Sequence, residues 1–263
     1  MARITTTGFY LLLIVLSISC SKEKDDPTEI ININDDLRVI MLEELKEGEN
    51  YFTFTVETIT DQNCQNYQID YSLVKNSSQI NLSINQLSLP EDCQPGNAPA
   101  RQSIRVGELS PQDYDLQINL NNNEIINPGR LLVSYSQYNI NLDSDHGIIL
   151  PDKLLNRMPA DAIWGYIGFH ELSQEFDIQS SFENSIDDLV EPHNYPSGYY
   201  GHFRISELNE LTIDADQEYS GQYNFLYRFR GEEEDLMPIL EDLRAQYGNQ
   251  IEIKLFTSSG SIL

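Results

Sequence analysis

The sequence predicts a chain of mixed architecture, with an all-β domain at residues 36–142 and an α+β domain at residues 161–263. Three observations lead to this prediction. Apolar and polar residues alternate with a period of two through most of the first region. Apolar stripes at helical spacing occur in the second region. A length of 263 residues is also comfortable for two domains.

The chain begins with the parts of a secretory signal peptide: Arg3, an apolar run over residues 9–16 that is too short to span a bilayer, and Ser19 before Cys20. Cys20 at this place resembles the lipobox cysteine of bacterial lipoproteins, although Ser17 stands where that family usually has an aliphatic residue. The resemblance implies loss of residues 1–19, a thioether-linked lipid and an acyl chain on Cys20, and a tether over residues 20–35. The alternative is an ordinary signal peptide with a chance cysteine.

Lys24, Asp25 and Asp26 follow Cys20 closely. A lysine followed by acids at this place resembles the signal that carries lipoproteins of the Bacteroidota to the outside of the outer membrane. The resemblance implies lipid anchoring in the outer membrane, with the protein facing the cell exterior. The alternative is a hydrated tether and nothing more.

Alternating residues predict the strands of the first domain, and turns rich in Asn, Pro and Gly separate them. The predicted strands cover residues 51–60, 68–74, 79–87, 103–106, 113–120 and 130–135. Residues 38–45 are a further candidate, but Glu43 and Glu44 leave it ambiguous. About seven short strands with turns between them are typical of an antiparallel sandwich.

Residues 107–118 resemble the corner before a late strand in immunoglobulin-like and fibronectin-type domains, because a loop ends in Tyr114 and a strand follows. The resemblance implies an immunoglobulin-like sandwich. After lipidation of Cys20, Cys64 and Cys93 form an even pair, which in an exported protein usually closes as a disulfide. No tryptophan lies in this region, so the bridge is expected to staple a loop rather than link two sheets.

The second domain follows a predicted linker at residues 143–160 and opens on an apolar run at residues 162–169. Apolar spacing predicts helices over residues 171–190 and 235–247, with Asp235 as N-cap, Pro238 in the first turn and Gly248 as C-cap. Alternation predicts further strands, at residues 199–206, 223–230 and 251–257. The order strand, helix, strand, strand, helix, strand suggests a ferredoxin-like βαββαβ fold.

The charge of the chain excludes some partners. Its 16 Lys and Arg against 42 Asp and Glu give a net charge of −26, and the basic residues are scattered. Phosphate backbones need clustered Lys and Arg, so nucleic acid is not an expected partner. The membrane is expected to be a partner through the lipid anchor alone.

The richest stretch for recognition is residues 191–203, where Gly and Pro fix a loop that carries aromatic residues. Aromatic faces on a loop suit sugar rings or a protein partner. The alternative is that these tyrosines cover the adjacent sheet. The candidate binding residues are Trp164, His193, Tyr195, Tyr199, Tyr200 and His202.

No catalytic motif, metal site or cofactor is predicted. A zinc site from His193 and His202 would need a carboxylate that converges on them, which the spacing does not promise. The main hypothesis is a non-enzymatic cell-envelope lipoprotein that binds a glycan or an envelope protein. The alternatives are a glycan-directed surface hydrolase that uses paired carboxylates, and a structural subunit of an envelope complex.

Overall fold

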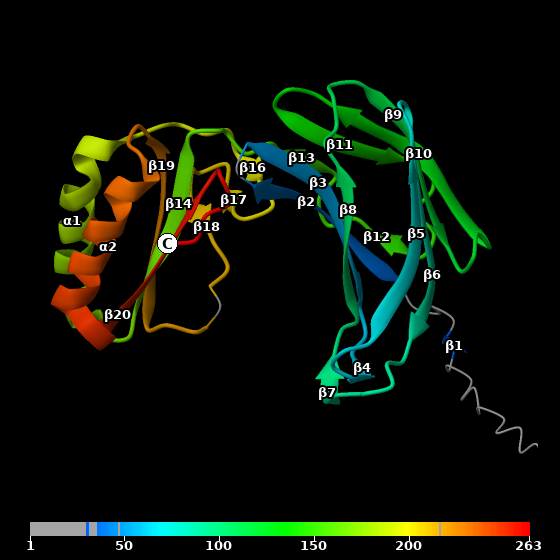
Figure 1. The fold of residues 1–263 in the computed structure, drawn as a ribbon, viewed down its shortest axis with the longest axis horizontal. Coiled ribbons are helices and arrows are strands. Elements are labelled where there is room, and N and C mark those ends of the chain that lie inside the picture. The colour runs from blue at the N-terminus through cyan, green and yellow to red at the C-terminus, as the bar shows by residue number, and fades with distance from the viewer. Residues whose placement is uncertain (1–29, 32–35, 47, 216) are drawn as a thin grey trace, which may run out of the picture.

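The computed structural model describes residues 30–31, 36–46, 48–215 and 217–263, which form two lobes (Figure 1). The predicted signal peptide, Cys20, and the motif of Lys24, Asp25 and Asp26 lie outside the described residues. The described residues of the first lobe form strands, whereas those of the second lobe combine strands with the helices α1 and α2. Within the described part of the chain, no helix has the length and apolar character needed to span a membrane.

In the part of the chain that the structure describes, the first lobe contains thirteen strands. These strands are β1 (Ile30–Ile31), β2 (Leu37–Lys46), β3 (Glu49–Thr58), β4 (Gln62–Cys64), β5 (Gln68–Lys75), β6 (Gln79–Ser88), β7 (Pro95–Ala98), β8 (Arg101–Gly107), β9 (Asp113–Leu120), β10 (Ile125–Val133), β11 (Gln137–Leu142), β12 (Ile148–Ile149) and β13 (Leu154–Asn156). A seven-stranded sheet has the order β1-β6-β9-β10-β11-β13, with β5 also paired to β6. A four-stranded sheet has the order β12-β2-β3-β8, and β4 pairs with β7.

The two large sheets of the first lobe share one apolar core. Val39 and Phe54 from the four-stranded sheet and Leu82 and Ile118 from the seven-stranded sheet are all buried in it. Alternate residues of each strand supply these side chains, as the period of two predicts. The expectation of a wholly antiparallel arrangement is wrong, because β6 runs parallel to β9 and β12 runs parallel to β2.

Residues 143–160, predicted to be a linker, contribute two strands to the first lobe. Ile148 of β12 pairs with Leu37, and Leu155 of β13 pairs with Tyr138. Ile148 and Leu155 are buried in the core of the first lobe. This stretch is polar enough to suggest a linker, but short strands at a sheet edge need few apolar residues to pair.

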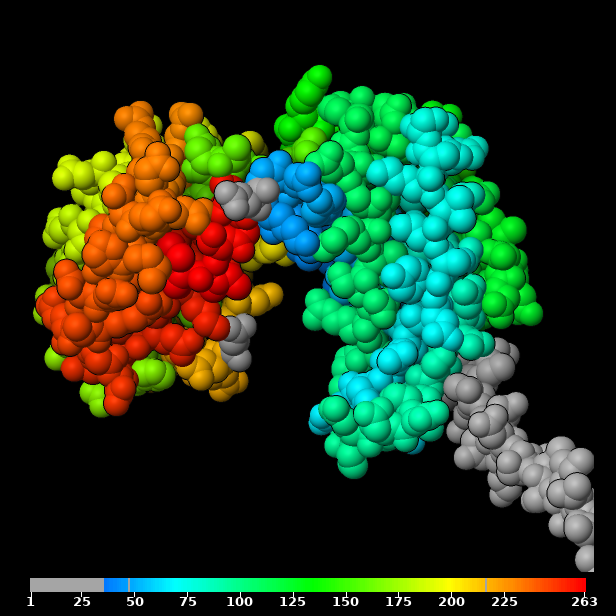
Figure 2. Space-filling view, viewed as in Figure 1, coloured from blue at the N-terminus to red at the C-terminus, as the bar shows by residue number. Residues whose placement is uncertain are grey.

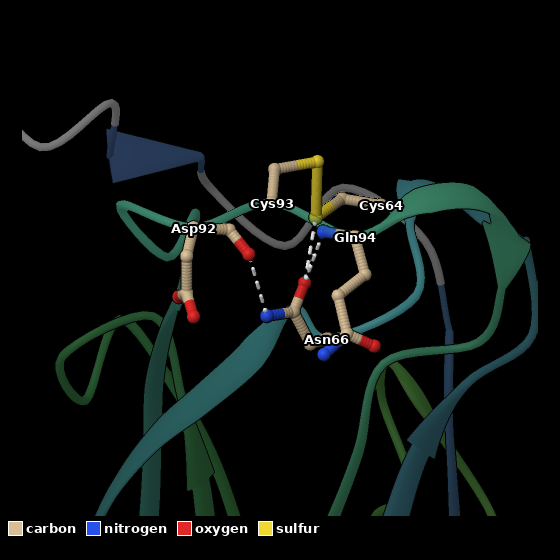
Figure 3. The surroundings of a disulfide bond; sticks show 5 residues. All are labelled: Cys64, Asn66, Asp92, Cys93 and Gln94. Carbon is tan, nitrogen blue, oxygen red and sulfur yellow. Dashed lines mark hydrogen bonds between the residues drawn. A yellow bond between two sulfur atoms is a disulfide. The ribbon is translucent and has the colours of Figure 1, made fainter.

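Cys64 and Cys93 lie at disulfide distance, with their Cα atoms 5.6 Å apart (Figure 3). Asn66 supports the same turn: its side-chain nitrogen donates to the carbonyl of Asp92 at 3.1 Å, and its side-chain oxygen accepts from the backbone N–H of Gln94 at 2.9 Å. The cysteines therefore join the β4 segment to the turn before β7, which is the loop staple that the sequence predicts.

The second lobe alternates strands and helices around a small inserted sheet. Its elements are β14 (Ala162–Phe169), η1 (Leu172–Gln174), α1 (Glu175–Ile186), η2 (Asp187–Leu189), β15 (Val190–Glu191), β16 (Gly198–Tyr199), β17 (Arg204–Ile205), β18 (Leu211–Thr212), β19 (Gly221–Phe229), α2 (Glu233–Tyr247), η3 (Gly248–Gln250) and β20 (Ile251–Thr257). The main sheet has the order β15-β19-β14-β20 and is antiparallel throughout. The small sheet has the order β16-β17-β18 and belongs to residues 192–220, which we call the insertion.

The main sheet of the second lobe is covered on both faces. Helices α1 and α2 cover one face, where Phe182 and Leu240 pack on Ile167 and Leu255 (Figure 1). The insertion covers the other face and forms a second core around Trp164. Because both faces are covered, every residue of β14 is buried, which explains its unbroken apolar sequence.

Two local predictions in the second lobe need correction. Helix α2 begins two residues earlier than predicted: Glu232 is the N-cap, Asp235 is the N3 residue of a capping box, and Pro238 lies beyond the first turn. The predicted strand over residues 199–206 is divided into β16 and β17 by a turn in which the N–H of Tyr200 donates to the carbonyl of Phe203.

The two lobes meet at a narrow contact. Figure 2 shows this waist where the blue residues of the β2–β3 hairpin reach the second lobe, with an open notch beside it. Gly201 of the insertion approaches Leu42 so closely that a Cβ atom would lie 2.8 Å from Leu42 Cδ1. Its φ of +85° is also one that favours glycine. The insertion is therefore part of the main sheet's cover and of the contact between lobes.

Candidate functional site

Three of the predicted binding residues are core residues. Trp164, Tyr195 and Tyr200 are at most 6% exposed and lie in the core beneath the insertion. The Trp164 ring is 5.6 Å from the Phe203 ring and 5.9 Å from the Phe256 ring, centroid to centroid. These three residues therefore do not form an exposed aromatic patch. They pack over the sheet, as the alternative prediction stated.

The buried tyrosines are satisfied within the lobe. The Tyr195 hydroxyl donates to the carbonyl of Tyr227 at 3.2 Å, and the Tyr200 hydroxyl donates to the carbonyl of Pro196 at 2.9 Å. Burial raises the pKa of each phenol to about 12. Both groups thus remain protonated near neutral pH and hold the insertion in place.

His193 is exposed and lines a hollow beside β19, which we call the β19 cleft. Its volume is about 260 Å³. The cleft is lined by His193, Asn194, Tyr195, Ile205, Asn209, Leu211, Tyr223, Asn224, Phe225, Leu226 and Tyr227. Two of the predicted residues, His193 and Tyr195, belong to this lining.

The β19 cleft exists because β19 lacks a full strand partner on one side. The short strand β15 pairs only with Arg228 and Phe229. Further along β19, side chains bridge to the insertion: Gln222 donates to the carbonyl of Ile213 at 3.0 Å, and Asn224 donates to the carbonyl of Leu211 at 3.1 Å. These side chains separate the backbone of the insertion from the edge of β19, and the space between the two is the cleft.

Several polar groups of the cleft are already used. The Tyr223 hydroxyl donates to Glu183 at 2.7 Å and lies 3.2 Å from the Tyr227 hydroxyl. Burial is the main cause that raises the pKa of both phenols. In contrast, His193, Asn194 and Asn209 are exposed, and none of their side chains has a hydrogen-bond partner among the described residues.

Tyr199 and His202 lie instead in a hollow between the lobes, the interlobe groove, of about 310 Å³. Its lining residues are Ile40, Leu42, Thr55, Arg101, Tyr199, Gly201, His202, Phe203, Arg204, Thr212 and Asp214. Arg204 lies 5.0 Å from the Tyr199 ring centroid and pairs with Asp152 at 2.6 Å. The charged residues of the lining are thus Arg101, Arg204 and Asp214, and the Arg204 charge is paired with Asp152 outside the lining.

A buried carboxylate holds the lobes together beside the interlobe groove. Glu43 occupies an inward position of β2 and is 0% exposed. It accepts hydrogen bonds from the Tyr138 hydroxyl at 3.0 Å, from Arg157 Nε at 3.2 Å and from the backbone N–H of Met158 at 2.7 Å. Its backbone carbonyl lies 2.8 Å from His202 Nε2.

The environment of His202 assigns it a structural role. Burial lowers the pKa of its imidazole, so the ring is neutral near pH 7 and can donate its Nε2 proton to the Glu43 carbonyl. The ring also lies 5.6 Å from that of Trp164. His193 and His202 thus face different hollows, and no cluster of three or more metal-ligating side chains occurs within the described residues.

A third hollow, of about 540 Å³, lies beside the tip of the β2–β3 hairpin. It brings together Glu49 and Glu108 with Lys46 and Arg157, but no histidine lines it. None of the three hollows combines two carboxylates with a histidine among its described lining residues. These three hollows therefore do not contain the pair of carboxylates with a histidine that the hydrolase hypothesis needs.

The stretch over residues 191–203, singled out in the sequence, contributes His193 and Tyr195 to the cleft, but most of the lining residues were not predicted. Asn194, Asn209, Tyr223, Asn224 and Tyr227 were not candidates. A weak signal was available for Asn194, which falls within residues 191–203, whereas Asn209 follows that stretch and Tyr223, Asn224 and Tyr227 lie on the strand predicted over residues 223–230. Which of them face one another depends on the short length of β15, which the sequence does not reveal.

Comparisons of the chain with protein-family models, with curated proteins and with solved structures gave no match. The assignment of a function thus depends on the site itself.

Proposed function

We propose that the protein is an exported lipoprotein, anchored through Cys20 and facing the cell exterior, that acts as a non-enzymatic binding module for a glycan or an envelope protein. The resemblance to a lipobox and the motif of Lys24, Asp25 and Asp26 support the address. The paired Cys64 and Cys93 support export, since disulfides persist in oxidising compartments.

The β19 cleft is the observation that carries the binding proposal. It is a concave site on the second lobe, lined by apolar side chains and by exposed polar side chains that have no hydrogen-bond partner among the described residues. Concave sites with a few convergent polar groups on an apolar lining are the usual form of ligand sites.

The arrangement of the lobes agrees with this role. In Figure 1, β1 lies at the end of the first lobe that is remote from the second lobe. An anchor that precedes β1 in the sequence would hold the first lobe nearer the membrane and present the second lobe away from it. The first lobe would then act as a spacer and the second as the recognition module.

We also propose a finer fold class for each lobe. The sheet order β15-β19-β14-β20, with α1 and α2 on one face, supports a ferredoxin-like fold for the second lobe, interrupted by the insertion. Two sheets around one core support a sandwich of immunoglobulin-like type for the first lobe.

The address is tested by comparing Cys20→Ala with the unchanged protein in cell fractions and by adding protease to intact cells. We expect the unchanged protein to remain with the outer membrane and to be cut from outside, and the variant to leave the membrane. Retention of the variant in the membrane, or protection of the unchanged protein from protease, would contradict the proposal.

The binding role is tested with the full-length protein in detergent, applied to immobilised neutral and acidic polysaccharides and used for cross-linking in living cells. We expect retention on a glycan or cross-linking to an envelope protein, with no release of new reducing ends from the glycan. Release of reducing ends would favour the hydrolase instead.

A further inference from the structure

We infer that the β19 cleft binds a neutral saccharide of one or two units, with the side chains of Asn194 and Asn209 hydrogen-bonded to its hydroxyl groups. This inference rests on the proposed binding function and names the class of ligand. It depends on the charge, the free polar groups and the size of the cleft.

The lining of the cleft carries no Asp, Glu, Lys or Arg, although such residues make up 22% of the chain. A charged ligand would lose hydration there without gaining an opposite charge. An anionic ligand would also approach a molecule whose net charge is −26. The cleft is therefore suited to an uncharged ligand.

Three exposed side chains of the lining have no hydrogen-bond partner among the described residues: the imidazole of His193 and the amides of Asn194 and Asn209. Asn194 and Asn209 come from different parts of the insertion and both line the cleft. Each amide offers donors and an acceptor, which matches the hydroxyl groups of a sugar because each hydroxyl also donates and accepts. Ile205, Leu211 and the ring of Tyr195 supply an apolar wall for the C–H faces of the sugar.

The dimensions and the strand edge argue against a peptide. A volume of about 260 Å³ lies below the range of roughly 300–1,000 Å³ that is usual for drug-sized ligands. A peptide that added a strand to β19 would need the edge of that strand. The side chains of Gln222 and Asn224 already cross this edge to the carbonyls of Ile213 and Leu211.

The test combines Asn194→Ala with Asn209→Gly in the full-length protein in detergent. Asn209 has a φ of +62°, so glycine removes the amide while keeping the backbone conformation. Asn249→Ala is the matched control, because Asn249 is exposed in η3, which leads into β20 at the opposite edge of the sheet. Thermal unfolding of all variants verifies that the fold is kept.

The probes are neutral disaccharides that contain glucose, galactose or mannose, with glucuronic acid, glucosamine and an unrelated hexapeptide for comparison, titrated by calorimetry. We expect at least one neutral disaccharide to bind, and the double variant to bind it roughly ten- to a hundredfold more weakly, because two hydrogen bonds are lost. The Asn249→Ala protein should bind as the unchanged protein does.

Preference for the uronic acid, the amino sugar or the peptide would overturn the inference, and so would undiminished binding by the double variant. If polysaccharides or envelope proteins bind in the earlier test while all neutral disaccharides fail here, the neutral-sugar inference falls and the binding function stands. If nothing binds in either test, both fall.

Discussion

Replacing Glu43 should weaken the junction between the lobes more than any nearby surface change. The Glu43→Ala substitution removes the acceptor for Tyr138, Arg157 and the backbone N–H of Met158. Removing one partner of a buried ion pair typically costs about 3–5 kcal/mol. The Arg157 side chain is 24% exposed and can regain some hydration, so we expect a loss near the lower end, about 3 kcal/mol.

Equilibrium unfolding in urea measures this loss. Trp164 is the only tryptophan and lies beside His202 at the junction, so its fluorescence reports the second lobe near the contact. Far-ultraviolet circular dichroism reports both lobes together. We expect Glu43→Ala to lower the urea midpoint in both signals and to separate the two transitions, because the lobes lose a shared set of hydrogen bonds.

Glu44→Ala is the matched control for this experiment. Glu44 is adjacent in the sequence but faces outward, where it pairs with Arg105 and Lys46. Partly exposed pairs of this kind contribute about 0–1 kcal/mol. The reasoning would be refuted if Glu43→Ala changed the unfolding free energy no more than Glu44→Ala does.

Three further predictions concern stability. Burial lowers the pKa of His202 below its ordinary 6.5, so the unfolded chain takes up this proton at a higher pH than the folded chain does. The free energy of unfolding should therefore be greatest above pH 6.5 and should fall as the pH drops through the folded pKa. The urea midpoint of His202→Gln should fall less over the same pH range. Cys64 and Cys93 are 29 residues apart in the sequence, so reducing the bridge should lower the free energy of unfolding by roughly 3 kcal/mol. Urea unfolding with and without reductant measures this difference. The Gly165→Ala substitution should lower the free energy of unfolding by about 3 kcal/mol, because the added Cβ would lie 2.1 Å from the Lys254 carbonyl oxygen. Scanning calorimetry measures this loss.

Local patterns in the sequence were enough to find most long elements. The alternation at residues 251–257 gave β20 with its observed bounds, and the apolar stripe before Gly248 gave most of α2. The parallel pairing of β6 with β9 was not predictable, because alternation specifies which face is buried and not which strand lies alongside. The short strands β12 and β13 were missed for the related reason that tertiary pairing, rather than propensity, creates them.

The same distinction explains the outcome for the site. Aromatic residues suit both recognition and cores, so the sequence could not separate His193, which is exposed, from Trp164, which is buried. Glu43 gave a clearer signal than was used. It follows Leu37, Val39 and Met41 at a spacing of two, and an acid in the next inward position indicates a buried carboxylate with dedicated partners.

The insertion connects the features that matter for function. One segment supplies Asn194 and Asn209 to the β19 cleft, Tyr200 to the core over Trp164, and His202 to the carbonyl of Glu43. Among the described residues, the insertion has no continuous strand pairing with β19, so its position depends on the side-chain bridges from Gln222 and Asn224, on the core around Trp164 and on the first lobe. Glu43 stands at a position of β2 where an apolar residue would fit the alternation, and its hydrogen bonds to Tyr138, Arg157 and Met158, with His202 on its carbonyl, link the first lobe to the insertion.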